Sequence, residues 1–176
     1  MNPDLTPDAW SSEIDSWRLA MHAMRLTPQT IDLRAYHVRR LARAELADSP
    51  WSVNPSSLLD WIGQHNWRRE TARAVRSSMR RFWAWGIDTG RTTENIATIL
   101  PMVKPEHPQP RPAESRVVSR AIGAADSRVV LMLRLANELG MRRGEVAQVH
   151  PENDMVPDVV GWSLIVHGKG QRKRVL

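Results

Sequence analysis

The 176-residue sequence contains no cysteine, only three lysines, one tyrosine and one phenylalanine, and it has no long hydrophobic run. Without cysteine the chain forms neither disulfides nor thiolate metal sites. No window approaches the roughly eighteen consecutive apolar residues of a membrane-spanning helix. The first ten residues, MNPDLTPDAW, carry acidic side chains where a signal peptide carries basic and hydrophobic ones. We therefore expect a soluble, cytoplasmic protein that does not bind membranes.

The histidines also lack a pattern that would hold a metal. They lie at positions 22, 37, 65, 107, 150 and 167 and show no ligand spacing such as HExxH. We expect no metal site and no cofactor.

Positive charge is the main feature that is present. The formal net charge is +6 and the isoelectric point is near 10.9, and because lysine occurs only at positions 104, 169 and 173, the positive charge is almost entirely arginine. Guanidinium groups bind phosphate in pairs of hydrogen bonds, and each neutralised phosphate releases counterions. The balance favours a nucleic acid as partner, although a GC-rich genome also produces an arginine-rich composition.

Hydrophobic spacing predicts consecutive helices in the first hundred residues. Thr6 is the expected N-cap of the first helix, Pro28 begins the second, and Gly90 ends the fourth. The expected ranges are 7–25, 28 to a break at 48–50, 55–64, 67–89 and a short helix at 94–100. The inward-facing residues of the first two are predicted to be Trp10, Ile14, Trp17, Met21, Ile31, Ala35, Val38, Ala42 and Leu46. The tryptophans at 10, 17, 61 and 83 are assigned to the core.

The fourth predicted helix carries a row of positive charge beside its apolar face. At 100° per residue, one narrow arc contains Arg69, Arg73, Arg76 and Arg80. Like charges three and four residues apart repel each other, so the row predicts an anionic ligand along it. The acidic residues of this helix, Glu70 and Asp88, are expected to lie outside the row. The alternative is a basic face that is simply solvated.

Residues 101–113 are predicted to be an extended linker, because five of the first twelve residues after position 100 are proline. Beyond it we expect helices at 115–125 and 127–140, with Gly140 ending the second. That second helix is apolar on most of its surface and is predicted to be buried. A short helix or turn follows. The strand 162–167 is then expected to turn at 168–170 into a strand at 172–176.

Two motifs in the last part of the chain, GMRRGE at 140–145 and GKGQRKR at 168–174, occur in the order and context seen in a known family. Together with TPQTIDLRAYHVRRL, PSSLLDWI and Asn95-Ile96-Ala97 upstream, they resemble the tyrosine recombinases, the phage integrase family. The resemblance covers essentially the whole chain. It implies a mainly α protein: a four- to five-helix SAM-like core-binding domain at 1–100, a linker at 101–113, and the α+β start of a catalytic domain with a β-hairpin at 114–176.

The resemblance also implies a function and roles for particular residues. The family carries out site-specific DNA recombination and integration in phages and mobile elements, cleaving and rejoining double-stranded DNA through a 3'-phosphotyrosyl intermediate as a homo-tetramer on two sites. Arg142 matches an arginine that stabilises charge on the phosphate, Lys169 a general acid, and Glu145 an acid that orients the site. Arginine cannot replace Lys169, because its pKa is too high to release a proton. The expected DNA-binding residues are Arg69, Arg73, Arg76, Arg80, Arg143 and Lys173.

The sequence departs from the family pattern at its end. The H-x-x-R box and the late tyrosine nucleophile of the family do not appear before Leu176, and Tyr36, the only tyrosine, is assigned to packing. We expect these 176 residues to bind DNA without cleaving it, as part of a longer integrase in a bacterial cell or phage-infected host. Two alternatives stay open: a naturally truncated, noncatalytic regulator of recombination, and a helical protein-interaction module with incidental basicity.

Overall fold

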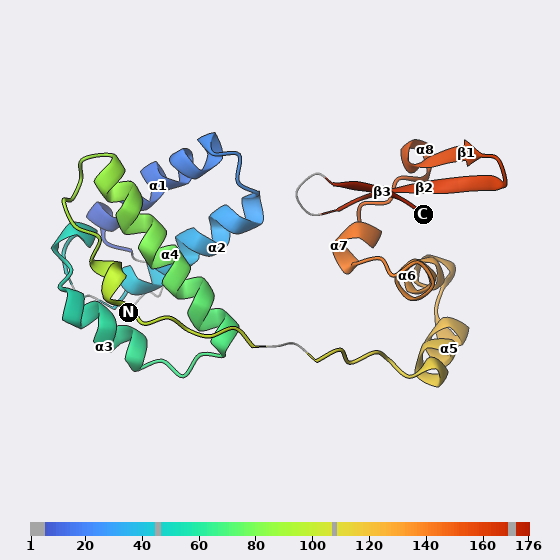
Figure 1. The fold of residues 1–176 in the computed structure, drawn as a ribbon, viewed down its shortest axis with the longest axis horizontal. Helices are drawn as coiled ribbons and strands as arrows, with labels where there is room; N and C mark the ends of the chain where they lie inside the picture. Colours follow the sequence, from blue (N-terminus) through green and yellow to red (C-terminus); the bar gives the residue numbers. More distant parts are fainter. Residues whose placement is uncertain (1–5, 45–46, 107–108, 169–171) are drawn as a thin grey trace. The chain divides into compact units, whose positions relative to one another are not determined.

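The computed structural model describes residues 6–44, 47–106, 109–168 and 172–176. The chain divides into two compact units, Met1–Pro108 and Gln109–Leu176, and the division falls within the proline-rich segment (Figure 1). None of the helices in the described ranges combines the length and apolarity needed to cross a bilayer.

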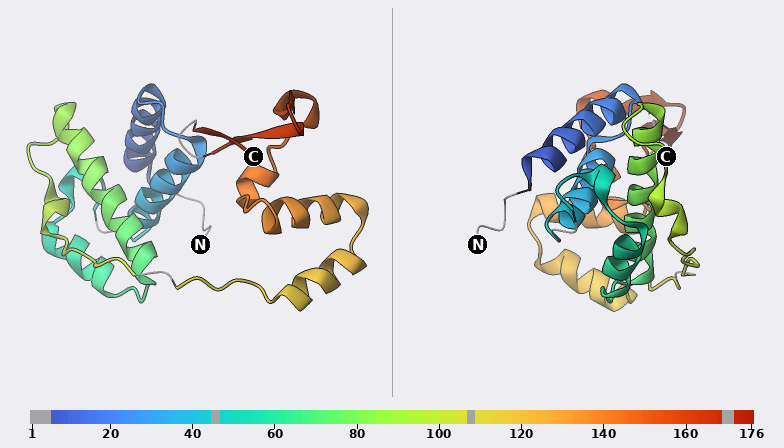
Figure 2. Two further views of the ribbon diagram at one scale, coloured as in Figure 1. Left: turned by 45° about the vertical axis from the view of Figure 1, so that its right-hand side comes forward. Right: turned by 90° about the vertical axis from the view of Figure 1, so that its left-hand side faces the viewer.

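The first unit is helical. In chain order its elements are α1 (Asp8–Ala23), α2 (Pro28–Ala42), the 3₁₀ turn η1 (Pro50–Ser52), α3 (Pro55–Gly63), α4 (Arg69–Asp88) and the 3₁₀ turn η2 (Ile96–Ile99). Helix α2 packs against both α1 and α4, and η2 packs against α3 and α4 (Figure 2). The short helix predicted at 94–100 is present as the 3₁₀ turn η2.

An aromatic cluster forms the centre of this unit. Phe82 on α4 stacks on Trp51 with ring centroids 5.1 Å apart, and it meets Trp17 edge to face at the same distance. Buried aromatic rings contribute large apolar areas and prefer these two geometries. The inward residues predicted for the first two helices are buried where they are described, and so are the four tryptophans assigned to the core. Leu46 lies outside the described residues.

Local signals explain where these helices begin and end. Pro28 begins α2, and the side chain of Asn54 accepts a hydrogen bond from the Ser56 backbone N–H (2.9 Å) at the start of α3. Gly90, with a φ of 72°, follows α4 as expected. The predicted N-cap of the first helix is wrong by one residue, because Pro7, in an extended conformation, occupies that position and α1 begins at Asp8.

The second unit combines short helices with a small sheet. Its elements are α5 (Ser115–Ala124), α6 (Ser127–Asn137), α7 (Arg143–Val146), α8 (Pro151–Asp154), β1 (Met155–Asp158), β2 (Gly161–His167) and β3 (Lys173–Val175). The strands form an antiparallel sheet in the order β1-β2-β3, with Val166 opposite Arg174 and His167 opposite Lys173. The predicted pairing of the last two strands is confirmed.

Strand β1 was not predicted. Its four residues, Met-Val-Pro-Asp, include a proline, which removes a backbone donor and is tolerated only where a strand has a free edge. In the structure β1 pairs with β2 alone, with Pro157 opposite Trp162, so the sheet accommodates the proline.

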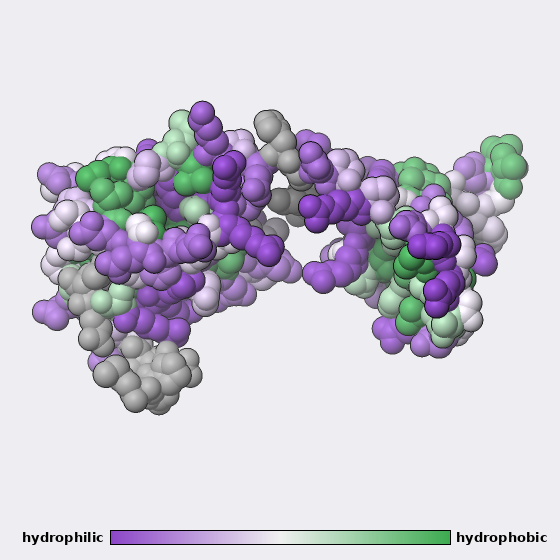
Figure 3. Space-filling model, turned by 90° about the horizontal axis from the view of Figure 1, so that it is seen from below, coloured by the Kyte–Doolittle hydropathy of each residue, from purple (hydrophilic) through white to green (hydrophobic). Residues whose placement is uncertain are grey.

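The predicted burial of the helix at 127–140 is wrong. Within the described residues neither α5 nor α6 contains a buried side chain, and Val129 and Leu131 on α6 are 40% and 53% exposed. An apolar helix is buried only when enough neighbouring elements cover it, and here α6 packs mainly against α5 and α7. Hydrophobic atoms of this unit therefore reach the surface between hydrophilic ones (Figure 3).

Candidate functional site

Arg142 stands at the start of α7, where the chain has just reversed after α6. Gly140 has a φ of 61°, a conformation that glycine adopts without strain, and the buried Met141 anchors the next position. Arg142 is in an extended conformation as the N-cap of α7, and 77% of its side chain is exposed. Its guanidinium is therefore presented to solvent from a fixed backbone.

Glu145 is the buried acid that holds this arrangement. Its side chain is 6% exposed, and its Oε2 accepts from the Arg142 backbone N–H (2.9 Å) while its Oε1 accepts from Arg142 Nη1 (2.9 Å). Oε2 also accepts from Arg174 Nη2 of β3 (2.9 Å). The Arg142 backbone and side-chain donors and the Arg174 charge together hold the pKa of Glu145 below its usual value, against the opposing effect of burial. Glu145 is thus a carboxylate ion that joins α7 to β3.

The base of the β2–β3 hairpin packs against the same carboxylate. Gly168 donates its backbone N–H to the Arg172 carbonyl (2.7 Å). A Cβ atom at position 168 would lie 3.2 Å from that carbonyl and 3.6 Å from Glu145 Oε1, so the close approach favours glycine. Lys169, the expected general acid, lies outside the described residues.

These elements surround a hollow of about 550 Å³, a size typical of small-ligand sites. We call it the cationic hollow. Among its described lining residues Glu145 carries the single negative charge, and four side chains are cationic. Such a lining favours an anion with several oxygens, as a phosphate has. The lining residues are Arg142, Glu145, Gly168, Arg172, Lys173 and Arg174.

The cationic hollow contains some of the predicted residues and adds two others. Arg142, Glu145 and Lys173 are brought together, whereas Arg143 is exposed on α7 and is not among the lining residues. Arg172 and Arg174 were not named as site residues. The signal for Arg174 was present, because it is the last residue of the GKGQRKR motif, but its role depends on strand pairing.

The arginine row on α4 is less uniform than its spacing suggested. Arg73 donates from Nη1 to both carboxylate oxygens of Glu70 (2.8 and 2.9 Å), so Glu70, although it is not a member of the row, pairs with one of its arginines. Two long side chains three residues apart on a helix reach each other easily. Arg76 donates from Nε to the Leu100 carbonyl (3.0 Å) and so anchors the end of η2. Arg69 and Arg80 complete the row on the same helix.

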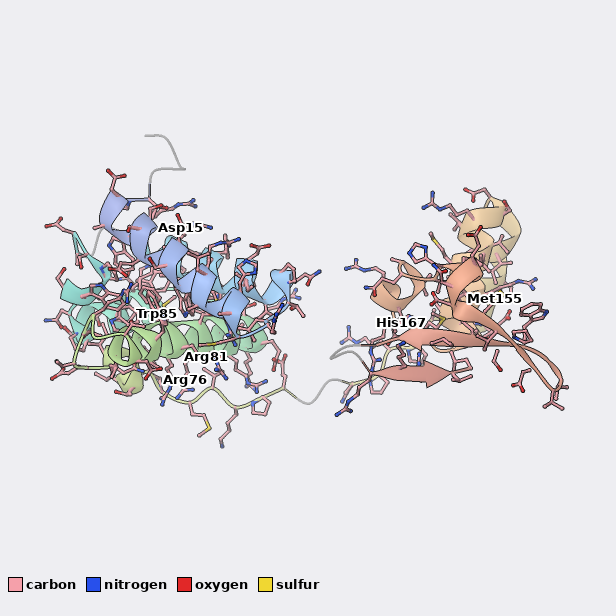
Figure 4. The ribbon with its side chains drawn as sticks, turned by 90° about the horizontal axis from the view of Figure 1, so that it is seen from above. Asp15, Arg76, Arg81, Trp85, Met155 and His167 are labelled. Carbon is pink, nitrogen blue, oxygen red and sulfur yellow. The ribbon has the colours of Figure 1, made fainter. Side chains whose placement is uncertain are left out.

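A second hollow, of about 360 Å³, lies beside this row. It is lined by Arg76, Ser77, Arg80, Arg81, Ala84 and Asn95. Arg81 was not predicted as a site residue, yet it is exposed and projects from α4 as Arg76 does (Figure 4). It also faces Arg34 of α2, whose pKa is lowered by burial and then by the charge of Arg81. Arg34 and Arg81 are like charges that repel each other, and together they extend the basic surface from α4 toward α2.

Tyr36 does not have the packing role predicted for it. Its side chain on α2 is 51% exposed, and its ring lies 5.9 Å from that of His37. The periodicity of α2 placed Ala35 and Val38 inward; His37 between them is also buried, whereas Tyr36 turns toward the surface.

No family model matches the chain, and no curated protein matches it. Solved structures do. The integrase from mycobacterium phage Brujita is 25% identical, with 93% of this chain and 56% of that chain covered and a TM-score of 0.51. A lambda integrase (75-356) dimer bound to a COC' core site is 17% identical, with 94% and 61% covered and a TM-score of 0.72.

A lambda integrase tetramer bound to a Holliday junction is 18% identical, with 94% of this chain and 49% of that chain covered and a TM-score of 0.72. The chain therefore spans about half of the length of the integrases that it matches. Its neighbours in structure are phage integrases, and it has the fold of that family of tyrosine recombinases.

Proposed function

We propose that the protein takes part in site-specific DNA recombination as an integrase of the tyrosine recombinase type. The observation that carries the proposal is the cationic hollow, where Arg142, the buried Glu145 and the base of the β2–β3 hairpin meet. This is the arrangement that a reaction at a phosphodiester requires, because guanidinium donors in fixed positions stabilise charge that develops on the nonbridging oxygens.

The residues of the second unit divide between binding and chemistry. Arg142 binds the phosphate, and Glu145 orients Arg142. Lys169, which follows Gly168 in the sequence, donates a proton to the oxygen that leaves. Lys173 lines the same hollow and contacts the backbone of the DNA, as Arg143 does from α7. In this proposal residues 114–176 belong to a catalytic domain.

The helical unit binds the duplex. Its basic side chains on α4 supply positive charge along the DNA backbone. Two of them are restrained in the free protein: Arg73 by Glu70 and Arg76 by the Leu100 carbonyl. We assign DNA contacts to Arg69, Arg73, Arg76 and Arg80, with residues 1–100 as a core-binding domain. Residues 101–113 then link the two domains around double-stranded DNA.

The covalent step requires a tyrosine, and the only tyrosine of these 176 residues is Tyr36 on α2. We assign it no catalytic role, so these residues bind DNA without cleaving it. In a complete recombinase, cleavage and rejoining proceed through a 3'-phosphotyrosyl intermediate in a tetramer on two sites. The alternative is a noncatalytic protein that occupies recombination sites and regulates the intact enzyme.

Duplex binding tests the proposal. In gel-shift titrations across salt concentrations, the logarithm of the binding constant should fall linearly with the logarithm of salt, with a slope of about −0.9 per phosphate neutralised. Arg142→Ala and Arg80→Ala should each weaken binding and lower that slope. Arg116→Ala is the matched control, because Arg116 is an exposed arginine on α5 whose side chain pairs with Glu114. Binding that does not depend on salt would favour the protein-interaction module.

Cleavage is tested separately with a nicked duplex that traps the covalent intermediate. The 176-residue chain should give no protein–DNA adduct on a denaturing gel. An adduct that disappears in Tyr36→Phe would show that Tyr36 is a nucleophile, contrary to the assignment above.

A further inference from the structure

We infer that Arg174 is a positioning residue, which acts through Glu145 to hold Arg142 and the base of the β2–β3 hairpin in one arrangement. The consequence of this positioning for DNA binding rests on the proposed function. The positioning itself is a property of the free protein and can be tested without DNA.

The strand pairing places Arg174 on the side of the sheet that faces α7. Arg174 lies opposite Val166, and paired residues of an antiparallel sheet project from the same face. Val166 is 1% exposed, so this is the inner face of the sheet. The neighbouring Lys173 pairs with the exposed His167 on the other face of the sheet; it borders the cationic hollow but forms no ion pair with Glu145 among the described residues. Arg174 therefore lies on the same face as the buried Val166, although its own side chain is partly exposed.

Glu145 is the partner of Arg174, and it is shared. Its Oε2 accepts from Arg174 Nη2 and from the Arg142 backbone N–H, both at 2.9 Å, while its Oε1 accepts from the Arg142 guanidinium. Gly168 lines the same hollow, and a Cβ atom at that position would lie 3.6 Å from Glu145 Oε1. Three segments that are separate in sequence thus meet at one buried carboxylate: the N-terminus of α7, the base of the hairpin, and β3.

Charge and burial indicate that Arg174 acts through Glu145 and not by direct contact with a phosphate. Its side chain is 42% exposed, whereas that of Arg142 is 77% exposed. Removal of one partner from a buried charged pair leaves the other charge poorly compensated. Without Arg174, the bonds from Arg142 are the ones that Glu145 keeps among the described residues, and β3 loses this link to α7.

The first test uses the DNA-free protein. In Arg174→Met, the backbone amides of Arg142 and Gly168 should exchange hydrogen at least several-fold faster, and the pKa of Glu145, followed by NMR of its carboxyl carbon, should rise because a neighbouring cation is lost. Arg174→Lys should restore part of both effects. Lys173→Met, which removes a cation from the opposite face, should change neither. Unchanged exchange and titration in a folded Arg174→Met protein would overturn the inference.

The second test is a double-mutant cycle in DNA binding. Arg174→Met should weaken binding about tenfold in the wild-type background, and by less than about twofold once Glu145→Gln is present, because the two changes break one connection. Lys173→Met is expected to weaken binding by the same factor in both backgrounds. Equal effects of Arg174→Met in both backgrounds would mean that Arg174 contacts the phosphate directly, contrary to the inference.

The two tests separate the possible failures. If the chain does not bind DNA but the amides and the Glu145 carboxyl respond as described, the proposed function fails and the positioning role stands. Circular dichroism and thermal melting of each variant show whether a loss of binding reflects unfolding.

Discussion

His37 on α2 is a buried histidine with a defined hydrogen-bonding role. The Ser78 hydroxyl donates to the Ala74 carbonyl (3.0 Å), so the contact between His37 Nδ1 and Ser78 Oγ (2.9 Å) has the ring as donor. Burial and, to a lesser extent, the charge of Arg40 lower the pKa of His37 from its ordinary value of 6.5. Near pH 6.5, where a histidine of the unfolded chain takes up a proton, the His37 ring of the folded protein therefore stays neutral.

This lowered pKa predicts how the stability of the helical unit depends on pH. When a folded pKa lies below the unfolded one, the unfolded state binds more protons between them, so stability is complete above about pH 6.5 and falls as pH decreases below it. Urea unfolding followed by tryptophan fluorescence reports on this unit, because Trp162 is the one tryptophan outside it. His37→Gln should flatten the curve between pH 5 and 7, and an unchanged slope would assign the dependence to another group.

Two buried carboxylates predict a separate acid dependence for the second unit. Asp154 accepts from the His150 backbone N–H (2.8 Å) and from His167 Nε2 (3.0 Å), and these donors lower its pKa, as Arg142 and Arg174 lower that of Glu145. Their stabilisation is present above the ordinary values of 3.8 and 4.5 and is lost as pH falls through the lower folded values.

Amide exchange in β2 measured between pH 3 and 6 checks this prediction. Exchange rates are corrected for their intrinsic pH dependence, and the remaining loss of protection should begin near pH 4.5 in the wild type. Asp154→Asn should show lower protection at pH 6 and a weaker dependence on acid. A variant with the wild-type profile would show that Asp154 does not stabilise the sheet.

At the residue scale, the motifs identified part of the site and packing supplied the rest. Arg142 and Glu145 could be predicted because their spacing and their order before the hairpin are visible in the sequence. Arg174 and Arg81 could not, because their roles depend on the face of a strand and on the approach of α2 to α4. Arg81 belongs to no motif, and the GKGQRKR motif, which ends at Arg174, does not show that this arginine pairs with Glu145.

At the element scale, α4 contains a glycine at a position where only glycine fits. A Cβ atom on Gly86 would lie 2.5 and 2.7 Å from ring atoms of Trp51, whose ring stacks on Phe82. Gly86→Ala gains about 1 kcal/mol of helix propensity. Trp51 is partly buried against the core, and overpacking there costs about 1–3 kcal/mol, so the net change should be destabilising.

Gly63, the last residue of α3, is the matched control, because a Cβ atom there would have no neighbour within 4 Å among the described residues. Gly63→Ala should leave the unfolding free energy unchanged or raise it by less than about 1 kcal/mol. Chemical denaturation of both variants measures the difference. Equal stabilities would mean that Trp51 moves aside without loss.

The elements themselves were predictable to different degrees. Helices α1 to α4 follow from apolar spacing, proline at the first turn and glycine after the last, because these signals are local. Strand β1 was missed, because a proline-containing strand of four residues forms only when β2 pairs with it. The exposure of α6 was missed for a related reason: an apolar sequence does not specify how many neighbours will cover it.

At the scale of the whole molecule, the composition of the linker should influence DNA binding. Proline-rich segments are extended and semi-rigid, and a stiffer linker of suitable length raises the effective concentration of the second binding unit. Replacement of Pro105, Pro110 and Pro112 by glycine should weaken DNA binding by roughly two- to tenfold while the melting temperature of each unit stays the same. Equal affinities would indicate that one unit accounts for the binding.

The division into two units was visible in the sequence as a change from helical periodicity to repeated proline. The partner was less fully specified, because a positive net charge favours any polyanion and only the order of two motifs narrowed the choice. The sequence does not show which arginines pair with acids. On α4 and at Glu145 these pairs determine which cations are held in place.

The alternation of side chains along β3 limits which insertions and deletions this hairpin tolerates. Val166 and Arg174 share one face, while His167 and Lys173 share the other. Loss of one residue within β3 would exchange the two sets, so that lysine would meet Glu145 and the guanidinium would point to solvent. Length changes should therefore be rejected within the strand itself.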